Sequence, residues 1–173
     1  MHRTPIVRTR HPDEIGECVA MLGLVHAIDG YPARWPDNPR PWLTPAGTVG
    51  AWVAADPEGL AGHVVMHRPT GDAEAAWVCA AAGSEPARMG LVSRLFVVPR
   101  ARRAGVGAAL LETVAGEASA RGLRPGLAVT DGDRSAMALY ERCGWERVDS
   151  TPWTWAGGGA TVLHCYLGPT ANS

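Results

Sequence analysis

A turn rich in arginine and glycine is the part of the sequence best suited to hold an anion. A strand-like run ends at Val98 and Pro99, three arginines follow within residues 100–103, and Gly105 and Gly107 stand where a helix begins. The first amides of a helix lack carbonyl partners, and the helix dipole favours negative charge at that end. Glycines carry no side chain, so a ligand can approach those amides closely. The pattern therefore predicts a site for a diphosphate.

Two familiar phosphate-binding motifs do not match this turn. The dinucleotide fingerprint needs a third glycine where Leu110 stands, and its first glycine follows the strand almost directly. A Walker-type loop needs a lysine, and all 16 basic residues of this chain are arginines. The absence of lysine also excludes Schiff-base chemistry and a lysine-bound pyridoxal phosphate. A tight turn with a solvated arginine cluster remains the purely structural alternative.

Two segments carry a resemblance to a known family. Residues 102–107 read Arg-Arg-Ala-Gly-Val-Gly, and residues 136–145 read as a helix that ends near Tyr140, followed by Gly144 and Trp145. Both patterns resemble the GNAT superfamily of acetyl-CoA-dependent N-acetyltransferases, whose signature is Gln/Arg-x-x-Gly-x-Gly/Ala between a strand and a helix. The resemblance is strong over about residues 90–148, and before residue 90 it rests on the order of elements. It implies one GNAT-type domain over residues 1–173.

The resemblance implies which residues of these segments bind acetyl-CoA, the co-substrate of the family. Main-chain groups of the strand before the turn would pair with the pantetheine arm, and amides of the turn and helix would hold the pyrophosphate. The cofactor-binding residues implied in this way are Leu95, Phe96, Val97, Arg102, Arg103, Ala104, Gly105, Val106, Gly107, Ala108 and Asp133. Tyr140 is implied as the catalytic acid that protonates the departing thiolate. Its structural alternative is a core-facing position on the helix.

Two positions depart from the family pattern and leave the general base open. Asp133 stands where the family often has asparagine; an ionised carboxylate accepts hydrogen bonds but cannot donate them, and it also suits a helix N-cap. Leu91 stands where some members carry a glutamate base. The candidate bases are His26, Asp29, His63, His67, Asp131 and His164. His63 and His67 share one face of a strand, but they lack the glutamate and the helix of an HExxH motif, so no metal site is expected.

The acceptor side of the site is predicted from two aromatic segments. In the family, the loop after the first helix and the terminal hairpin wall the acceptor pocket. Here these segments are residues 29–36 and 151–155, which both contain tryptophan and proline. The substrate-binding candidates are Asp29, Tyr31 and Trp35. Aromatic rings held by proline would form an apolar or cation-binding wall, and the alternative is that the tryptophans pack the core.

The predicted reaction is direct transfer of an acetyl group from acetyl-CoA to the primary amine of a small molecule. Two alternatives stay open. One is a protein N-terminal acetyltransferase, which needs an open groove for a peptide. The other is a non-catalytic acyl-CoA-binding domain of the same fold. A nucleic-acid partner is not expected, because the formal net charge is −1. A homodimer is left open.

The composition and the cysteine pattern favour a folded protein of the cytoplasm. Apolar residues make up 46% of the chain and charged residues 19%, as in globular domains. No run of about 18 apolar residues exists, so neither a membrane span nor a membrane partner is expected. Residues 1–10 hold three arginines and no apolar core, unlike a signal peptide. The four cysteines form neither CxxC nor a zinc-ligand spacing, which favours reduced thiols.

Hydrophobic periodicity and turn residues predict a mixed α+β order of elements. We expect strands over residues 5–9, 49–54, 60–67, 91–98, 127–130, 145–148 and 162–167, with a weak strand at 77–80. We expect helices over residues 12–28, 105–121 and 133–142, and one helical turn in the proline-rich loop 29–45. The GNAT resemblance arranges them as a mixed, mostly antiparallel central sheet of about six to seven strands. In that fold about four helices flank the sheet, which is splayed between its fourth and fifth strands.

Overall fold

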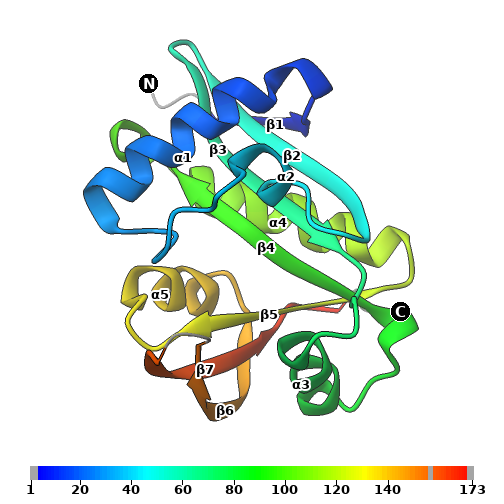
Figure 1. The fold of residues 1–173 in the computed structure, drawn as a ribbon. Coiled ribbons are helices and arrows are strands. Elements are labelled where there is room, and N and C mark those ends of the chain that lie inside the picture. Colours follow the sequence, from blue (N-terminus) through cyan, green and yellow to red (C-terminus); the bar gives the residue numbers. More distant parts are fainter. Residues whose placement is uncertain (1–3, 156–157, 171–173) are drawn as a thin grey trace. The chain divides into compact units, whose positions relative to one another are not determined.

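The computed structural model describes residues 4–155 and 158–170. Within these residues, seven strands form one sheet in the order β1-β2-β3-β4-β5-β7-β6 (Figure 1). The strands are β1 (Ile6–Thr9), β2 (Thr48–Asp56), β3 (Gly59–His67), β4 (Met89–Val97), β5 (Arg124–Thr130), β6 (Glu146–Thr154) and β7 (Ala160–Leu167). The α-helices are α1 (Ile15–Asp29), α2 (Pro39–Trp42), α3 (Ala73–Ala82), α4 (Val106–Ala120) and α5 (Arg134–Arg142). The predicted α+β class is confirmed.

The pairing of the strands makes the sheet mixed and mostly antiparallel. β4 and β5 run parallel, whereas β1–β2, β2–β3, β5–β7 and β7–β6 are antiparallel pairs. The β4–β5 ladder joins Met89–Leu91 to Arg124–Gly126. The rest of β4, which includes the predicted pantetheine-pairing segment, therefore lies beyond the ladder with β5.

The described chain divides into two compact units, each made of two segments. The first unit contains Met1–His67 and Val92–Val114, and the second contains Arg68–Leu91 and Ala115–Ser173. β4 contributes its first residues to the second unit and the remainder to the first.

In the first unit, α1 and α4 each bury one apolar face. The buried side chains recur at spacings of three and four: Cys18, Met21, Leu22 and Val25 on α1, and Val106, Leu110, Leu111 and Val114 on α4. Gly62 on β3 approaches α4 so closely that a Cβ atom would lie 2.9 Å from both Val106 Cγ1 and Leu110 Cδ1. This close approach fixes the first turns of α4 against β3.

The second unit contains the one element whose type the sequence analysis predicted wrongly. Residues 77–80 were expected as a weak strand, but they belong to α3. Asp72 caps this helix by accepting a hydrogen bond of 2.8 Å from Ala75 N, and Gly83 ends it in the left-handed conformation at φ 61°. Local capping and a high alanine content favour a helix, and they outweigh the preference for a strand that the short apolar run suggested. This adds one α-helix to the expected number.

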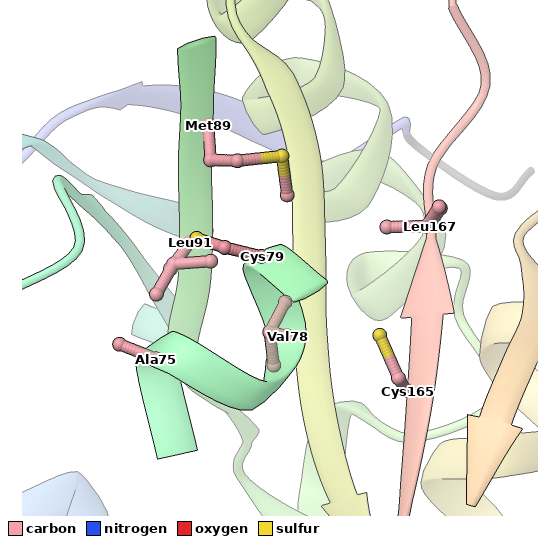
Figure 2. Close-up of a cluster of buried hydrophobic side chains, with 7 residues drawn as sticks. All are labelled: Ala75, Val78, Cys79, Met89, Leu91, Cys165 and Leu167. Carbon is pink, nitrogen blue, oxygen red and sulfur yellow. The ribbon is translucent and has the colours of Figure 1, made fainter. Parts of the chain in front are cut away.

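α3 is held by a cluster of buried apolar side chains, shown in Figure 2. The cluster comprises Ala75, Val78 and Cys79 on α3, Met89 and Leu91 on β4, and Cys165 and Leu167 on β7. A Cβ atom at Gly126 on β5 would lie 2.9 Å from Met89 Cε and 3.3 Å from Val78 Cγ1. A larger residue at this position would therefore require the side chains of the cluster to shift.

Candidate functional site

The turn between β4 and α4 has the backbone geometry of an anion site. A 3-10 turn at Pro99–Ala101 follows β4, and Arg103 and Gly105 then adopt positive φ values of 64° and 78°. The first hydrogen bond of α4 runs from Ala109 N to Gly105 O at 3.0 Å. The amides of residues 106–108 precede this bond and have no carbonyl partner within the helix. A Cβ atom at Gly105, the residue before these amides, would meet nothing within 4 Å.

Two of the three arginines of this turn, Arg100 and Arg102, are engaged in ion pairs and hydrogen bonds. Arg102 donates from Nη1 to Asp29 Oδ1 at 3.0 Å, pairs with the same carboxylate through Nη2, and also donates to Val97 O at 3.2 Å. Arg100 donates to Asp56 Oδ2 at 2.5 Å and to Leu60 O at 3.1 Å, which ties it to the β2–β3 hairpin. Two members of the sequence cluster are thus fixed by acidic partners. Asp29, predicted on the acceptor side, and Arg102, predicted on the cofactor side, are in direct contact.

Removing the two arginines next to the glycines should weaken binding of CoA. In the double variant Arg102→Ala, Arg103→Ala, we expect about fivefold lower affinity and a flatter salt dependence, since exposed charges contribute about 1 kcal/mol and are screened. Isothermal titration calorimetry at two salt concentrations measures both. Arg100→Ala is the matched control, because Arg100 lies outside the Arg102–Gly107 motif and is tied to the β2–β3 hairpin through Asp56 and Leu60 O. Normal affinity and salt dependence in the double variant would leave the pair as a surface feature only.

The predicted pantetheine segment combines a buried side chain with main-chain groups beyond the β4–β5 ladder. Phe96 is 4% exposed, and its ring stacks on that of His63 with a centroid distance of 5.0 Å and an interplanar angle of 16°. Val98 N donates to Ala61 O at 2.9 Å, which joins the end of β4 to β3. The side chain of Phe96 thus anchors the segment in the core. Pairing of the segment with a ligand remains a prediction.

His63 is removed from the candidate bases by its hydrogen bonds. Its Nε2 lies 2.8 Å from Arg10 Nη1, and its Nδ1 lies 2.9 Å from Arg94 O. Arginine can only donate and a carbonyl can only accept, so the ring is neutral with its proton on Nδ1. Burial lowers the pKa of His63 to about 4. No lone pair is left to take a proton from a substrate, and the residue instead holds Arg10 and β4 in place.

The predicted acceptor residues all lie in the first unit, in two groups. The ring of Tyr31 lies 6.4 Å from that of Trp42 and 6.5 Å from that of Phe96, so it joins the acceptor loop to the predicted cofactor strand. Trp35 is 37% exposed and packs 5.3 Å from the ring of His26. An open pocket of about 560 Å³ is lined by Arg34, Trp35, Pro36, Asp37, Asn38, Pro41 and Trp42.

Arg94 contacts this loop and was not predicted from the sequence to do so. Its guanidinium lies 3.8 Å from the ring centroid of Trp42, and its Nε donates to Trp42 O at 2.9 Å. Arg94 adopts a positive φ of 55° within β4, which is uncommon for a residue other than glycine. No short-range pattern marks such a residue, because the contact joins positions 52 apart in the chain.

Tyr140 and Asp133 belong to the second unit and lie on α5 and at its N-cap. Tyr140 is 7% exposed, and its ring lies 5.5 Å from that of Tyr166 and 6.1 Å from that of Trp145. Asp133 accepts a hydrogen bond of 3.2 Å from Ala136 N, which confirms its role as the N-cap. Its role in cofactor binding and the catalytic role of Tyr140 remain predictions.

The described part of the chain contains neither a metal-binding cluster nor a helix that could span a membrane. Among residues 4–155 and 158–170, no group of three or more histidine, cysteine, aspartate or glutamate side chains is arranged to hold a metal ion. In the same part of the chain, no helix combines the length and the apolar character needed to cross a bilayer.

The chain is similar in fold to several solved acetyltransferases. A putative phosphinothricin N-acetyltransferase is 18% identical with a TM-score of 0.69, and the match covers 97% of this chain and 99% of that one. The ribosomal-protein-S18-alanine N-acetyltransferase from Escherichia coli is 15% identical with a TM-score of 0.70, covering 98% and 96%. Arabidopsis thaliana NAA60, solved in complex with acetyl-CoA, is 18% identical with a TM-score of 0.70, covering 95% and 97%.

The structural neighbours show the fold of the chain, and its sequence shows the family. No curated protein matches the chain at a significant level. The family model described as "Acetyltransferase (GNAT) family" matches residues 16–145. This range includes the β4–α4 turn and Tyr140, the two features on which the resemblance rests. The chain therefore belongs to the GNAT acetyltransferase family.

Proposed function

We propose that this protein transfers an acetyl group from acetyl-CoA to the primary amine of a small molecule. The observation that carries the proposal is the first turn of α4, where the amides of residues 106–108 precede the first intrahelical hydrogen bond, next to Gly105, at which a Cβ atom would meet nothing within 4 Å. These amides suit the pyrophosphate of acetyl-CoA. Membership of the GNAT family supplies the reaction type, and neighbours in fold such as NAA60 are solved with acetyl-CoA.

The proposed reaction is a direct transfer between two bound substrates. The amine nitrogen attacks the carbonyl carbon of the thioester, a new C–N bond forms, and the C–S bond breaks. The sulfur leaves as a thiolate and takes a proton from the phenol of Tyr140, which is an uncharged donor at neutral pH. The amine loses a proton to a base that stays open, and His63 is excluded from that role by its two hydrogen bonds.

The acceptor is expected to meet the loop that follows α1. Tyr31, Trp35 and Trp42 give this loop an aromatic surface, which suits the apolar or cationic part of an amine. One neighbour in fold is named for the acetylation of phosphinothricin and another for that of a ribosomal-protein alanine, so fold alone does not select among amines. A protein N-terminus is the second acceptor class to test.

Thiol release from acetyl-CoA in the presence of a panel of amines tests the proposal. The panel should include small primary amines, amino acids and short peptides with free N-termini. We expect release that depends on a small amine, with the acetylated amine identified by mass spectrometry. Release with peptides alone would favour the N-terminal acetyltransferase. Tight acetyl-CoA binding without amine-dependent release would instead favour a non-catalytic binding domain. That the chain forms a single domain and that it lies in the cytoplasm remain predictions. Whether it forms a homodimer stays open.

A further inference from the structure

Three polar residues outside the predicted acetyl-CoA site are brought together by strand register. Ser150 on β6 is the direct partner of His164 on β7, and His164 is also the partner of Val129 on β5. Residues directly opposite each other in a sheet share a face, and so do residues two apart along a strand. Asp131 comes two residues after Val129, and its amide donates to Val162 O at 2.9 Å. Ser150, His164 and Asp131 therefore lie on one face at the end of this ladder.

Hydrogen bonds join these residues in a row. Ser150 Oγ lies 2.6 Å from His164 Nδ1, and His164 Nε2 lies 2.8 Å from Asp131 Oδ1. The imidazole is shielded, with 7% of its side chain exposed, whereas the Asp131 side chain is 65% exposed. Ser150 is exposed on β6, which is an edge strand of the sheet. Ser150 thus lies at the surface, whereas the ring that contacts it is enclosed.

The charges around Asp131 determine which nitrogen of His164 carries the proton. The hydrogen bond from His164 is the main cause that lowers the pKa of Asp131, and the charges of Arg134 and Arg147 lower it further. An ionised carboxylate only accepts, so Nε2 of His164 must carry the proton that it donates. In the tautomer with its one proton on Nε2, the lone pair of Nδ1 is directed at Ser150 Oγ. This is the tautomer that a base needs to activate a hydroxyl, with the carboxylate as its orienting partner.

We propose that Ser150, His164 and Asp131 form a separate acyl-transfer site, in which the Ser150 hydroxyl is a nucleophile toward small activated esters. Ser150 Oγ attacks the carbonyl carbon of the ester, and its proton passes to His164 Nδ1. The bond to the leaving oxygen breaks, and that oxygen takes the proton from His164 as the alcohol departs. The product is an acyl ester on Ser150. Water then attacks the carbonyl carbon of this ester and gives a proton to His164 Nδ1. The bond from that carbon to Ser150 Oγ breaks, and Oγ takes the proton back from His164, which releases the carboxylic acid and restores the serine.

The side chains beside Ser150 are apolar, which indicates the chemical class of ester that would bind there. Val162 precedes His164 by two residues on β7, is 36% exposed, and is the direct partner of Pro152 on β6. These two apolar side chains lie on the same face as the serine. They suit the acyl group or aromatic ring of a neutral ester better than a charged substrate.

Hydrolysis of p-nitrophenyl acetate, with fluorophosphonate labelling, tests this site. We expect Ser150→Ala to lower the amine-independent hydrolysis by about 10²-fold, the lower end of what one positioned base contributes. Mass spectrometry of wild-type peptides should locate the acetyl group and the phosphonate on Ser150. Asp131→Asn should slow labelling of Ser150 several-fold at unchanged thermal stability, because the exposed carboxylate orients the ring without touching the ester.

Ser119→Ala is the matched control, since Ser119 is an exposed serine on α4 outside the hydrogen-bonded row. It should hydrolyse the ester and label at the wild-type rate. Equal hydrolysis by Ser150→Ala and the wild type would overturn the proposal, as would label on another residue. Ser150 is exposed, so its alanine variant is expected to fold, and a thermal unfolding curve verifies this. Neither readout uses CoA or an amine, so the result is independent of the proposed acetyltransferase activity.

Discussion

Replacing Gly107 with glutamate is expected to abolish binding of acetyl-CoA while leaving the fold intact. Gly107 is the second residue of α4, between the amides proposed to hold the pyrophosphate. A carboxylate there would occupy the ligand's space and repel its charge. Two unit charges about 4 Å apart at a protein surface interact by about 4 kcal/mol, which corresponds to about 10³ in affinity. Calorimetric titration with acetyl-CoA measures the loss.

The same substitution is benign for the helix itself. Acidic residues in the first turn favour the helix dipole, so Gly107→Glu should not unfold α4. Gly116→Glu is the matched control, because Gly116 lies further along the same helix and a Cβ atom there meets nothing within 4 Å. It should bind acetyl-CoA like the wild type. A folded Gly107→Glu protein with undiminished affinity would show that the pyrophosphate binds elsewhere.

Replacing Tyr140 with phenylalanine should lower the rate of acetyl transfer by about 10²–10⁴, the usual contribution of one positioned acid. Phenylalanine keeps the ring that packs against Tyr166 and Trp145 but removes the proton of the phenol. The loss should appear in kcat rather than KM, because the contact strengthens only as charge develops on sulfur. Steady-state kinetics, under conditions where chemistry limits the rate, separate the two constants.

Tyr166→Phe provides a phenol-removing control in the same unit. The Tyr166 hydroxyl donates to Glu141 at 2.9 Å and accepts from Arg147 at 3.1 Å, so its loss should affect stability and not kcat. If Tyr140→Phe has the kcat of the wild type, the proton comes from water or another side chain. Tyr140 would then be a core residue of α5.

The elements that the sequence predicted well are those whose signals are local and agree with one another. α4 combines an apolar stripe with glycine at both ends, and α5 begins at the N-cap Asp133, so propensity, pattern and capping coincide. The prediction of a strand over residues 77–80 was wrong because a four-residue apolar run is too short to distinguish the period of a strand from that of a helix. The cap at Asp72 and the left-handed Gly83 lay outside that window, and together they would have indicated the helix.

In the candidate site, too, the features that could be predicted are those whose residues are neighbours in the sequence. The β4–α4 turn is contiguous in sequence, so its glycines and arginines could be recognised together. The contacts of Asp29 with Arg102 and of Ser150 with His164 could not, because they depend on how distant segments meet. The position of His63 on a strand could be predicted from the sequence. Its two hydrogen bonds could not, because they arise only from tertiary packing, and these bonds exclude it as a base.

With the roles predicted for Arg102 and Asp29, the ion pair between these two residues would couple cofactor binding to acceptor binding. An anion that takes Arg102 must break the pair, and so must a cation that takes Asp29. When both ligands bind, the pair is broken only once, so each ligand raises the affinity of the other by the same factor. That coupling free energy equals the strength of the pair, which is up to about 1 kcal/mol for exposed partners, or about fivefold. A single surface contact thus favours simultaneous occupancy by a phosphate-bearing donor and an ammonium-bearing acceptor.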